Sequence, residues 1–576
     1  MLMSFKKEKI HMKVKNLIDL RKQIGLLLLI LVSAGNIPVQ SAESAEGEAR
    51  AVLVEGTGTY TRPISTKSNI AQQFFDQGLR LTWGYYFPEA IASHQEALRY
   101  DPGHPMIYWG MAFAMGPNPN SRYAGMRDDP HGEAWKAITQ AVEHINRAND
   151  MERDFINTLY IRFDAKTHPL RADRDRAYLD AARALSEKYS NDPDAAALFA
   201  DAYMVIGKWD YWDKEGNPRP WTTQVAASLE SILKLRPDHP GANHLNIHLL
   251  EASWNPERGL VSADRLEALM PIAGHIVHMP AHIYVRVGQY DKAIAINERS
   301  LEADKKFLAA WGNHPFPNIG TYPLSARIHG PHAQEFIRYA ATVQGNYARA
   351  IEAGRRSAAG MQGDAKWSSR GQKRHAAVWM VQKIFGQWDA LLAEEDVPMD
   401  YPYLVGLRIY TRGSAHVGVG DLDGAKGQLQ TLEKMLQDPE IDSARIGVAP
   451  VSAVLSLAYA GLDGEIKEAE GDLAGAIAAY EAAIELEDTF RYIEPPEWAQ
   501  PMRHYLGAAL LKADRAKDAE AVYRRDLNWN QNNGWSLFGL SQSLEAQGRT
   551  TEAKEALEKY QTVWRGADVK LVRSRL

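Results

Sequence analysis

Apolar residues recur along this chain with the spacing of amphipathic helices, in segments of roughly 12 to 16 residues bounded by Gly- or Pro-containing turns. Alternating apolar and polar runs joined by hairpin turns, which would indicate strands, do not stand out. The pattern therefore predicts an all-α protein.

The helical segments also repeat at a regular length. In the first clear unit, small residues and a terminal proline stand where tetratricopeptide repeats have them, at Gly78, Ala90, Ala97 and Pro102. Small side chains at these positions let the two helices of a repeat approach closely. Similar units follow at 194–237, 271–293, 345–350, 420–425, 471–476, 507–519 and 534–560. We predict a tetratricopeptide-like α-solenoid, a right-handed superhelix, over residues 69–576.

Three insertions interrupt this period, at residues 118–130, 209–221 and 307–330. They are rich in Trp, Tyr, Pro and Gly. Long insertions in repeat proteins lie on one rim and often carry function. We therefore expect these segments to lie over the concave groove as a lid.

Two histidine pairs stand one repeat apart in the chain. His244 and His248, and then His278 and His282, have the i, i+4 spacing that places two imidazoles on one helix face. The second pair follows the first by 34 residues, the length of a tetratricopeptide repeat. Because stacked repeats place equivalent positions side by side, we expect the four rings to meet at one centre in the groove, within the histidine cluster at 244–335.

Other residues able to bind a metal ion lie close to these pairs. His275 precedes His278 by three residues, and the next repeat begins with His332. The candidate metal ligands are His244, His248, His275, His278, His282 and His332. The candidate catalytic residues are Glu251 and Glu335.

Imidazole and carboxylate ligands suit a transition metal ion and disfavour a cation such as calcium that prefers only oxygen. Six histidines would be enough for two three-histidine copper ions, and four histidines with the two glutamates would serve one or two iron ions. Neither helix carries the H-E-x-x-H motif of a zincin peptidase. We favour copper, with iron or zinc as alternatives.

Two interpretations without a metal stay open for this cluster, namely a groove that binds an anionic ligand and a structural polar network. A histidine that stands alone on a helix is usually a surface or core residue. We expect such a role for His94, His104, His131, His144, His168, His239, His375 and His416.

The N-terminus has the pattern of an export signal, with basic residues followed by the apolar run Ile24–Val32 and then small residues. This run is too short to span a bilayer, so no stable membrane anchor is expected. We predict a signal peptide over 1–41, a flexible linker over 42–68, and a periplasmic or secreted protein. Cleavage after Ala34 and initiation at Met12 stay open.

The chain of 576 residues contains no cysteine and has a formal net charge of −6 at pH 7. Without cysteine, thiolate catalysis, cysteine–zinc sites and a lipoprotein anchor are excluded. An exported protein without cysteine also avoids stray disulfides. No stripe of Lys and Arg follows the first residues, which argues against nucleic acid as a partner.

Several stretches resemble a bacterial family of tetratricopeptide proteins. The matching segments include the HxxxH motif within DHPGANHLNIHLLEAS, the GHxxHMPxH motif and a C-terminal EPPEW segment, and the resemblance covers most of residues 70–560. It implies the repeat fold and the groove histidines, but no particular reaction. Family members usually have a PHNxHF-like segment where this chain has PHAQEF, so His332 is retained while Glu335 replaces a second histidine.

The EPPEW segment brings Glu494, Glu497 and Trp498 close in sequence to His504, which again falls on a groove position of its repeat. A repeat near the end of the chain that curls toward the insertions would close the histidine site. A capping turn followed by an ordinary helix explains the same residues.

Three functions are compatible with these features. The first is an exported metal-dependent oxidoreductase that acts on a small or aromatic molecule among the Trp and Tyr side chains of the insertions. The second is a non-catalytic periplasmic scaffold that holds a peptide in its groove. The third is a metal-delivery protein. We favour the first, because a scaffold groove would normally carry Lys, Arg and Asn at the positions that hold histidine here.

Overall fold

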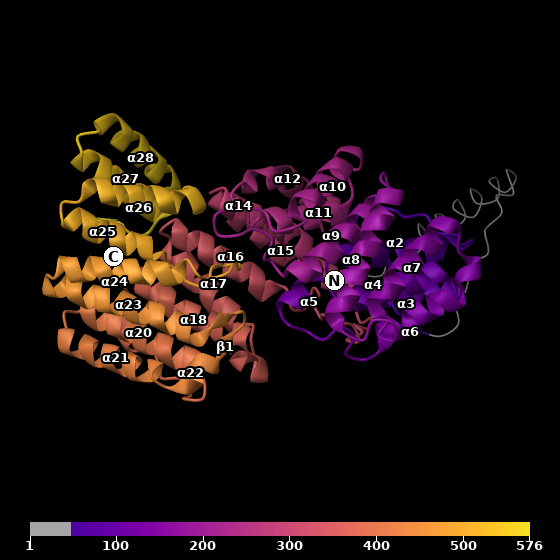
Figure 1. The fold of residues 1–576 in the computed structure, drawn as a ribbon, viewed down its shortest axis with the longest axis horizontal. Helices are drawn as coiled ribbons and strands as arrows, with labels where there is room; N and C mark the ends of the chain where they lie inside the picture. The colour runs from indigo at the N-terminus through magenta and orange to yellow at the C-terminus, as the bar shows by residue number, and fades with distance from the viewer. Residues whose placement is uncertain (1–47) are drawn as a thin grey trace, which may run out of the picture. The chain divides into compact units, whose positions relative to one another are not determined.

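The computed structural model describes residues 48–576, and their regular structure is almost entirely helical. Successive helices follow one another along the chain (Figure 1). The first half contains α2 (Asn69–Trp83), α3 (Phe87–Tyr100), α4 (Pro105–Met115), α5 (Pro119–Tyr123), α6 (Glu133–Glu143), η1 (Ile145–Arg147), α7 (Asp150–Phe163), α8 (Arg171–Lys188), α9 (Pro193–Gly207), α10 (Thr222–Leu235), α11 (Pro240–Leu250), η2 (Pro256–Gly259), α12 (Leu260–Leu269), α13 (Gly274–His278), α14 (Pro280–Arg286) and α15 (Tyr290–Trp311).

The second half continues in the same way. Its elements are α16 (Gly330–Val343), α17 (Tyr347–Ala359), η3 (Gly363–Trp367), α18 (Ser369–Ile384), α19 (Trp388–Leu392), α20 (Pro402–Gly418), α21 (Leu422–Leu436), α22 (Pro439–Ser443), β1 (Arg445–Ile446), β2 (Ala449–Pro450), α23 (Val451–Glu470), α24 (Leu473–Glu487), α25 (Met502–Lys512), α26 (Ala516–Trp529), α27 (Gly534–Ala546), α28 (Thr550–Val563) and η4 (Trp564–Gly566). Large buried side chains such as Trp83, Trp109 and Trp311 mark the apolar core between the helices.

Consecutive helices pack in pairs, for example α2 with α3, α16 with α17, and α23 with α24. Small residues allow this close packing. A Cβ atom added to Gly507 or Gly539 would lie only 2.3 or 2.2 Å from the ring of Tyr523, and Ala90 and Ala97 are completely buried. The predicted tetratricopeptide-like α-solenoid is confirmed.

Local sequence sets the start of the helix that carries the first histidine pair. Helix α11 begins at Pro240, whose missing N–H suits the first helical position. The preceding His239 caps the helix, because its Nδ1 accepts a hydrogen bond from the backbone N–H of Ala242 at 2.9 Å. Its Nε2 then donates to the buried carboxylate of Asp194 at 3.0 Å. His239 thus has the structural role expected of a histidine outside the cluster.

The second histidine pair lies on two short helices rather than on one. Helix α13 ends at His278 and α14 begins at Pro280. Proline has no N–H to donate to the preceding turn, so the regular helical hydrogen bond is missing at this point. Met279 keeps right-handed helical dihedral angles (φ −52°, ψ −38°). The rings of His278 and His282 therefore remain neighbours, with centroids 4.8 Å apart.

The segment before α2 packs against the repeats, which differs from the flexible linker predicted there. Its buried side chains are Ala51, Val54, Tyr60 and Ile64. The Tyr60 hydroxyl donates to Asp194 at 2.6 Å, and Arg62 forms an ion pair with the same carboxylate at 3.0 Å. A buried carboxylate needs such partners, so these contacts hold the segment in place. The predicted signal peptide and the start of the linker, within residues 1–47, lie outside the described residues.

The three insertions meet one another. The hydroxyl of Thr321, in the third insertion, donates to the backbone carbonyl of Asp128, in the first. The ring of Tyr123, in the first, lies 5.2 Å from that of Trp209, in the second. The third insertion is shorter than predicted, because α15 continues to Trp311.

The described residues contain one sheet, a hairpin of two very short strands. Strands β1 and β2 have two residues each and pair antiparallel around Gly447, which has the positive φ (65°) that such a turn requires. Its size leaves the all-α assignment unchanged. Across residues 48–576, no helix combines the length and the apolar content needed to cross a bilayer.

Candidate metal centre

The six predicted ligand histidines come together in the protein interior, although they are spread over four helices. They lie on α11 (His244, His248), α13 (His275, His278), α14 (His282) and α16 (His332). Five of them are at most 3% exposed, and His332 is partly buried. Their ring nitrogens form two groups of three, and within each group the candidate ligand atoms all lie within 4.8 Å of one another.

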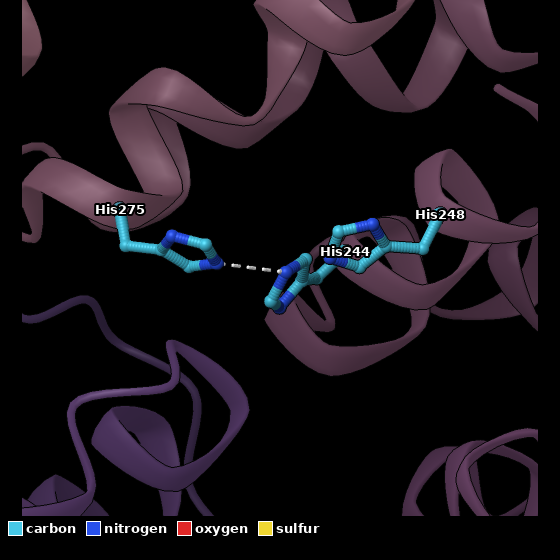
Figure 2. A group of neighbouring side chains, drawn as sticks. All are labelled: His244, His248 and His275. Carbon is cyan, nitrogen blue, oxygen red and sulfur yellow. Dashed lines mark hydrogen bonds between the residues drawn. The ribbon is translucent and has the colours of Figure 1, made fainter. Parts of the chain in front are cut away.

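The first histidine group consists of His244, His248 and His275 (Figure 2). The Nε2 atoms of His244 and His275 are 3.3 Å apart, and the ring of His248 lies 4.8 Å from that of His244. Two nitrogens that each bind one tetrahedral ion at about 2.0–2.1 Å would themselves be about 3.3 Å apart. The spacing of His244 and His275 therefore suits two ligands of a single ion.

The second histidine group consists of His278, His282 and His332. The Nε2 atoms of His278 and His282 are 2.9 Å apart, and the ring of His332 lies 4.9 Å from that of His278. The ring of Phe336 packs against both His278 and His282, at 4.7 and 4.6 Å. This apolar side chain helps to hold the two rings on one side of the helices.

Glu251 connects the two groups. Its carboxylate accepts hydrogen bonds from His248 Nδ1 at 2.7 Å and from His282 Nδ1 at 2.6 Å. The indole N–H of Trp209 and the hydroxyl of Tyr492 also donate to it, at 3.2 and 2.9 Å. Burial acts to raise the pKa of Glu251, but the attraction of His282 and the hydrogen bonds from both histidines outweigh this and lower it. The carboxylate is therefore ionised at neutral pH.

Hydrogen bonds at Nδ1 determine which nitrogen of each ring carries the proton. The carbonyl of Trp83 can only accept, so His244 Nδ1 donates to it at 2.6 Å. Glu251 accepts from His248 and His282, and Glu335 accepts from His332 at 2.9 Å. The side-chain oxygen of Asn297 accepts from His278 at 2.6 Å, since the Asn297 amide N–H donates elsewhere. Each of these five rings, when neutral, has its lone pair on Nε2.

As a result, hydrogen-bond acceptors face one another inside the site. The lone pairs of His278 and His282 meet at 2.9 Å, and His248 Nε2 is buried without a hydrogen-bond partner. A buried unsatisfied polar group costs roughly 1–3 kcal/mol. A cation bound in each group would satisfy these nitrogens. Carbonyl and carboxylate partners on the opposite ring nitrogen are also typical of metal-binding histidines.

Burial lowers the pKa of five of the six ligand rings, which leaves these five neutral and able to bind a metal ion. Desolvation is the largest cause, and repulsion from neighbouring rings adds to it. The pKa is lowered in this way for His244, His248, His275 and His278. Burial also lowers the pKa of His332, to about 4. At neutral pH no proton has to leave these rings before a metal ion binds.

The predicted single centre of four histidines is wrong. Each i, i+4 pair instead gathers a third ring, His275 for the first pair and His332 for the second. Neighbouring helix axes lie about 8–10 Å apart, so the rings of a pair reach each other more easily than they reach both rings of the other pair.

Glu335 lies behind His332 rather than among the ring nitrogens. It accepts from His332 Nδ1 at 2.9 Å and forms an ion pair with Arg374 at 3.1 Å. Between these two partners, the carboxylate is placed to orient the ring of His332. Burial acts to raise the pKa of Glu335, but Arg374 and His332 outweigh it and lower the pKa. Its catalytic role stays a prediction.

His329 is a seventh histidine that the sequence pattern did not single out. Its ring lies 5.4 Å from that of His275 and 5.2 Å from that of His278. Its Nδ1 hydrogen-bonds Asp304 at 2.9 Å, which repeats the arrangement at His332, and its buried Nε2 has no partner. His329 has neither i, i+4 spacing nor the repeat offset. The one signal in the sequence that could have identified it is its i, i+3 spacing from His332.

The loop before α25 closes part of the site, as the EPPEW segment suggested, through Glu494 of that segment and through the neighbouring Tyr492. Tyr492 hydrogen-bonds Glu251, and Glu494 approaches His282 Nδ1 to 4.0 Å. Burial and the nearby charge of Glu251 raise the pKa of Glu494 well above its usual value. Glu497 pairs instead with a lysine, Lys373, and His504 with Asp526, so neither joins the histidine groups.

Aromatic side chains from two other segments cover the first group. The ring of Tyr85 lies 4.4 Å from that of His244 and 5.5 Å from that of His275. Tyr85 has a positive φ of 59°, which is strained for a tyrosine and often occurs at functional sites. Trp209, from the second insertion, packs edge-on against His248 at 5.1 Å. The second insertion therefore covers this part of the site.

No family model matches this chain, and no curated protein matches it. Among solved structures, the human IFIT1 dimer with m7Gppp-AAAA is 14% identical, with 83% of this chain and 94% of that chain covered and a TM-score of 0.33. The APC/C hetero-tetramer Cut9–Hcn1 is 14% identical, with coverage of 86% and 74% and a TM-score of 0.28. These neighbours are helical-repeat proteins, and similarity at this level carries no argument about function.

Proposed function

We propose that this protein binds two transition-metal ions, one in each histidine group, and that it is a metal-dependent oxidoreductase. The observation that supports this most directly is the arrangement of the imidazole lone pairs. Five rings have Nδ1 bound to an acceptor, and the Nε2 atoms of His278 and His282 face each other at 2.9 Å. Glu251, which hydrogen-bonds a ring of each group, would couple the two ions.

We propose copper as the metal, with iron or zinc as the alternatives. Each group offers three imidazoles, the chain has no cysteine to compete for the ion, and copper binds such nitrogen ligands more tightly than zinc. When bound, copper or iron would supply electron-transfer chemistry. The protein contributes the positions of the rings, through Glu251, Glu335, Asn297 and the Trp83 carbonyl, and the exclusion of water by Tyr85 and Trp209.

The proposed substrate is small or aromatic. The surroundings of the site favour such a molecule, because Tyr85, Trp209 and Phe336 present ring faces next to the histidines. A delivery protein needs exposed, exchangeable ligands, whereas five of these histidines are at most 3% exposed. A peptide scaffold would leave the facing lone pairs without an explanation. Both remain the alternatives that the experiments below distinguish.

Export to the periplasm or cell exterior, and membership of the bacterial tetratricopeptide family with the HxxxH and GHxxHMPxH motifs, belong to the same proposal. They rest on the sequence. N-terminal sequencing of the exported protein is the test of the first, with a mature chain that begins near residue 42 as the expected result.

Metal analysis of the purified protein tests the binding proposal. We expect about two ions per chain, and about one in each of His248→Ala and His332→Ala, because each variant removes a ligand from a different group. His131→Ala, which changes an exposed histidine outside the site, is the matched control and should retain both ions. Equal metal content in wild type and in both site variants, with the helical circular-dichroism signal intact, would overturn the proposal.

Oxygen consumption tests the oxidoreductase part separately. Protein loaded with copper or iron is incubated with simple phenols and oxygen, and His248→Ala serves as the inactive comparison. Turnover in the wild type alone supports an enzyme. Two bound ions without turnover on any redox substrate would favour the delivery alternative.

A further inference from the structure

A pocket of about 530 Å³ lies between α6, α7, α8 and the first insertion. This volume is in the range of small-molecule sites. Five cationic residues line it: Arg127, Arg162, Lys166, Arg171 and Arg174. The carboxylates in its wall are Asp128 and Asp129. The lining therefore has a surplus of positive charge.

Both carboxylates are already engaged. Asp128 forms ion pairs with Arg171 at 3.0 Å and Arg174 at 2.9 Å, and also with Arg122. Asp129 accepts hydrogen bonds from the backbone at the start of α6, at 3.2 and 2.9 Å. In contrast, Arg127 and Lys166 form no ion pair with any residue in the described part of the chain. Their charges are available to a ligand.

Arg162 supplies the second, independent observation. Its side chain is 1% exposed, and one terminal nitrogen donates to Asp201 at 2.9 Å. The guanidinium lies over the ring of Tyr178, 4.4 Å from the centroid. Its Nε and its other terminal nitrogen are buried without a hydrogen-bond partner. Buried guanidinium N–H groups are normally satisfied, so an acceptor is missing at this wall of the pocket.

We propose that this pocket binds a small anion through a carboxylate or phosphate group. Arg162 donates to the anionic group from the base of the pocket, and Lys166 and Arg127 neutralise it from the exposed side. Planar guanidinium groups match both carboxylate and phosphate geometry. Trp135, which also lines the pocket, offers a ring face to the rest of the ligand.

The base of this pocket lies close to the histidine site. Burial raises the pKa of Tyr85, and among the charged groups around its hydroxyl Asp201 adds to this while Arg162 opposes it. The ring of Tyr85 packs against His244 and His275. The anion site nevertheless depends on no metal ion, so it stands or fails separately from the proposed oxidoreductase.

Calorimetric titration with inorganic phosphate and with benzoate tests the proposal, on the full chain at low ionic strength with and without added copper. We expect binding of at least one anion, weakened roughly tenfold or more in Lys166→Glu through the loss of a charge-assisted contact. Lys136→Glu makes the same charge change on α6, at a lysine that does not line the pocket, and should bind like the wild type.

Arg162→Lys is the second variant, because it keeps the charge but removes the planar fork; it should weaken binding to an intermediate degree. Tighter benzoate binding identifies an aromatic carboxylate, and tighter phosphate binding identifies a phosphate compound. No binding of either anion to the wild type, or equal loss in Lys166→Glu and Lys136→Glu, overturns the site. Because metal-free protein is included, these results do not depend on the metal proposal.

Discussion

Two regions of this solenoid bury ionisable side chains, and they satisfy them in different ways. In the second half, Lys383 on α18 pairs with Glu465 on α23 at 2.9 Å and donates to the hydroxyl of Tyr505 at 2.5 Å. Tyr505 in turn donates to Gln500 at 2.8 Å. Lys383, Glu465 and Tyr505 thus satisfy one another within the chain, although the amide nitrogen of Gln500 is buried without a partner.

The histidine site has the opposite property. Five of its rings have Nδ1 bound to an acceptor, but the Nε2 atoms of His278 and His282 face each other without a donor, and that of His248 has no partner. Both regions are buried, so burial alone does not separate a structural network from a functional one. The difference is whether the polar groups satisfy each other or require a cation from outside.

The largest expected effect of a single substitution is on the Lys383 network. Lys383→Met leaves the carboxylate of Glu465 buried without its cation, which should destabilise the fold by about 3–5 kcal/mol. Urea unfolding measures the loss, and adding Glu465→Leu should recover most of it. Metal content should not change in either variant. A parallel loss of metal would show that the two regions are not independent.

Metal binding should stabilise the histidine site in return. Copper at about one hundred times its dissociation constant should add roughly 2.7 kcal/mol per site to the free energy of unfolding. Thermal unfolding with and without copper is the measurement. The double variant His248→Ala/His332→Ala, which lacks a ligand in each group, should show no increase, and the Lys383→Met variant should show the full one.

The carboxylates behind the rings provide a smaller effect. Glu251→Gln should weaken metal binding roughly 10–100-fold in both groups, because Glu251 orients a histidine of each. Glu335→Gln should weaken it in the second group alone, since Glu335 contacts only His332 there. Chelator competition for each ion distinguishes the two variants. Equal effects of both substitutions on both ions would contradict the separate roles.

The smallest expected effect concerns the pH dependence of stability at His94, a buried group unlike those of the two regions above. It is fully buried on α3 without a hydrogen-bond partner, and burial lowers its pKa to about 3. The unfolded chain binds a proton at His94 near pH 6.5, whereas the folded chain does not. The free energy of unfolding is therefore highest above pH 6.5 and falls as the pH is lowered toward 3. The loss should be about 1 kcal/mol between pH 6.5 and 5.5.

The variant His94→Gln should lack this part of the pH dependence when urea unfolding is measured at the two pH values. Its metal content should match that of the wild type, since in the described part of the chain the ring of His94 packs against Phe75 and not against a ring of either histidine group. An unchanged pH dependence would mean that His94 gains a proton in the folded state as easily as in the unfolded one.

Much of the fold could be predicted because the repeat is a local property. Gly78 and Ala90 mark where two helices must approach, and Pro240 marks where α11 begins, from neighbouring residues alone. The segment with Tyr60 and Arg62 was misjudged as a linker, because its partners, Asp192 and Asp194, lie about one hundred and thirty residues away.

For the site, the amino-acid sequence by itself determined the repeat, the two histidine pairs and hence the six rings that come together. Periodicity carries this information, since helix spacing and repeat length place residues on a face. The tertiary structure alone decided how the rings divide into two groups, that His329 lies beside them, and that Tyr492 reaches Glu251 from 241 residues away. Ring contacts and hydrogen bonds depend on distances between helices that share no local pattern, so no spacing in the chain encodes them.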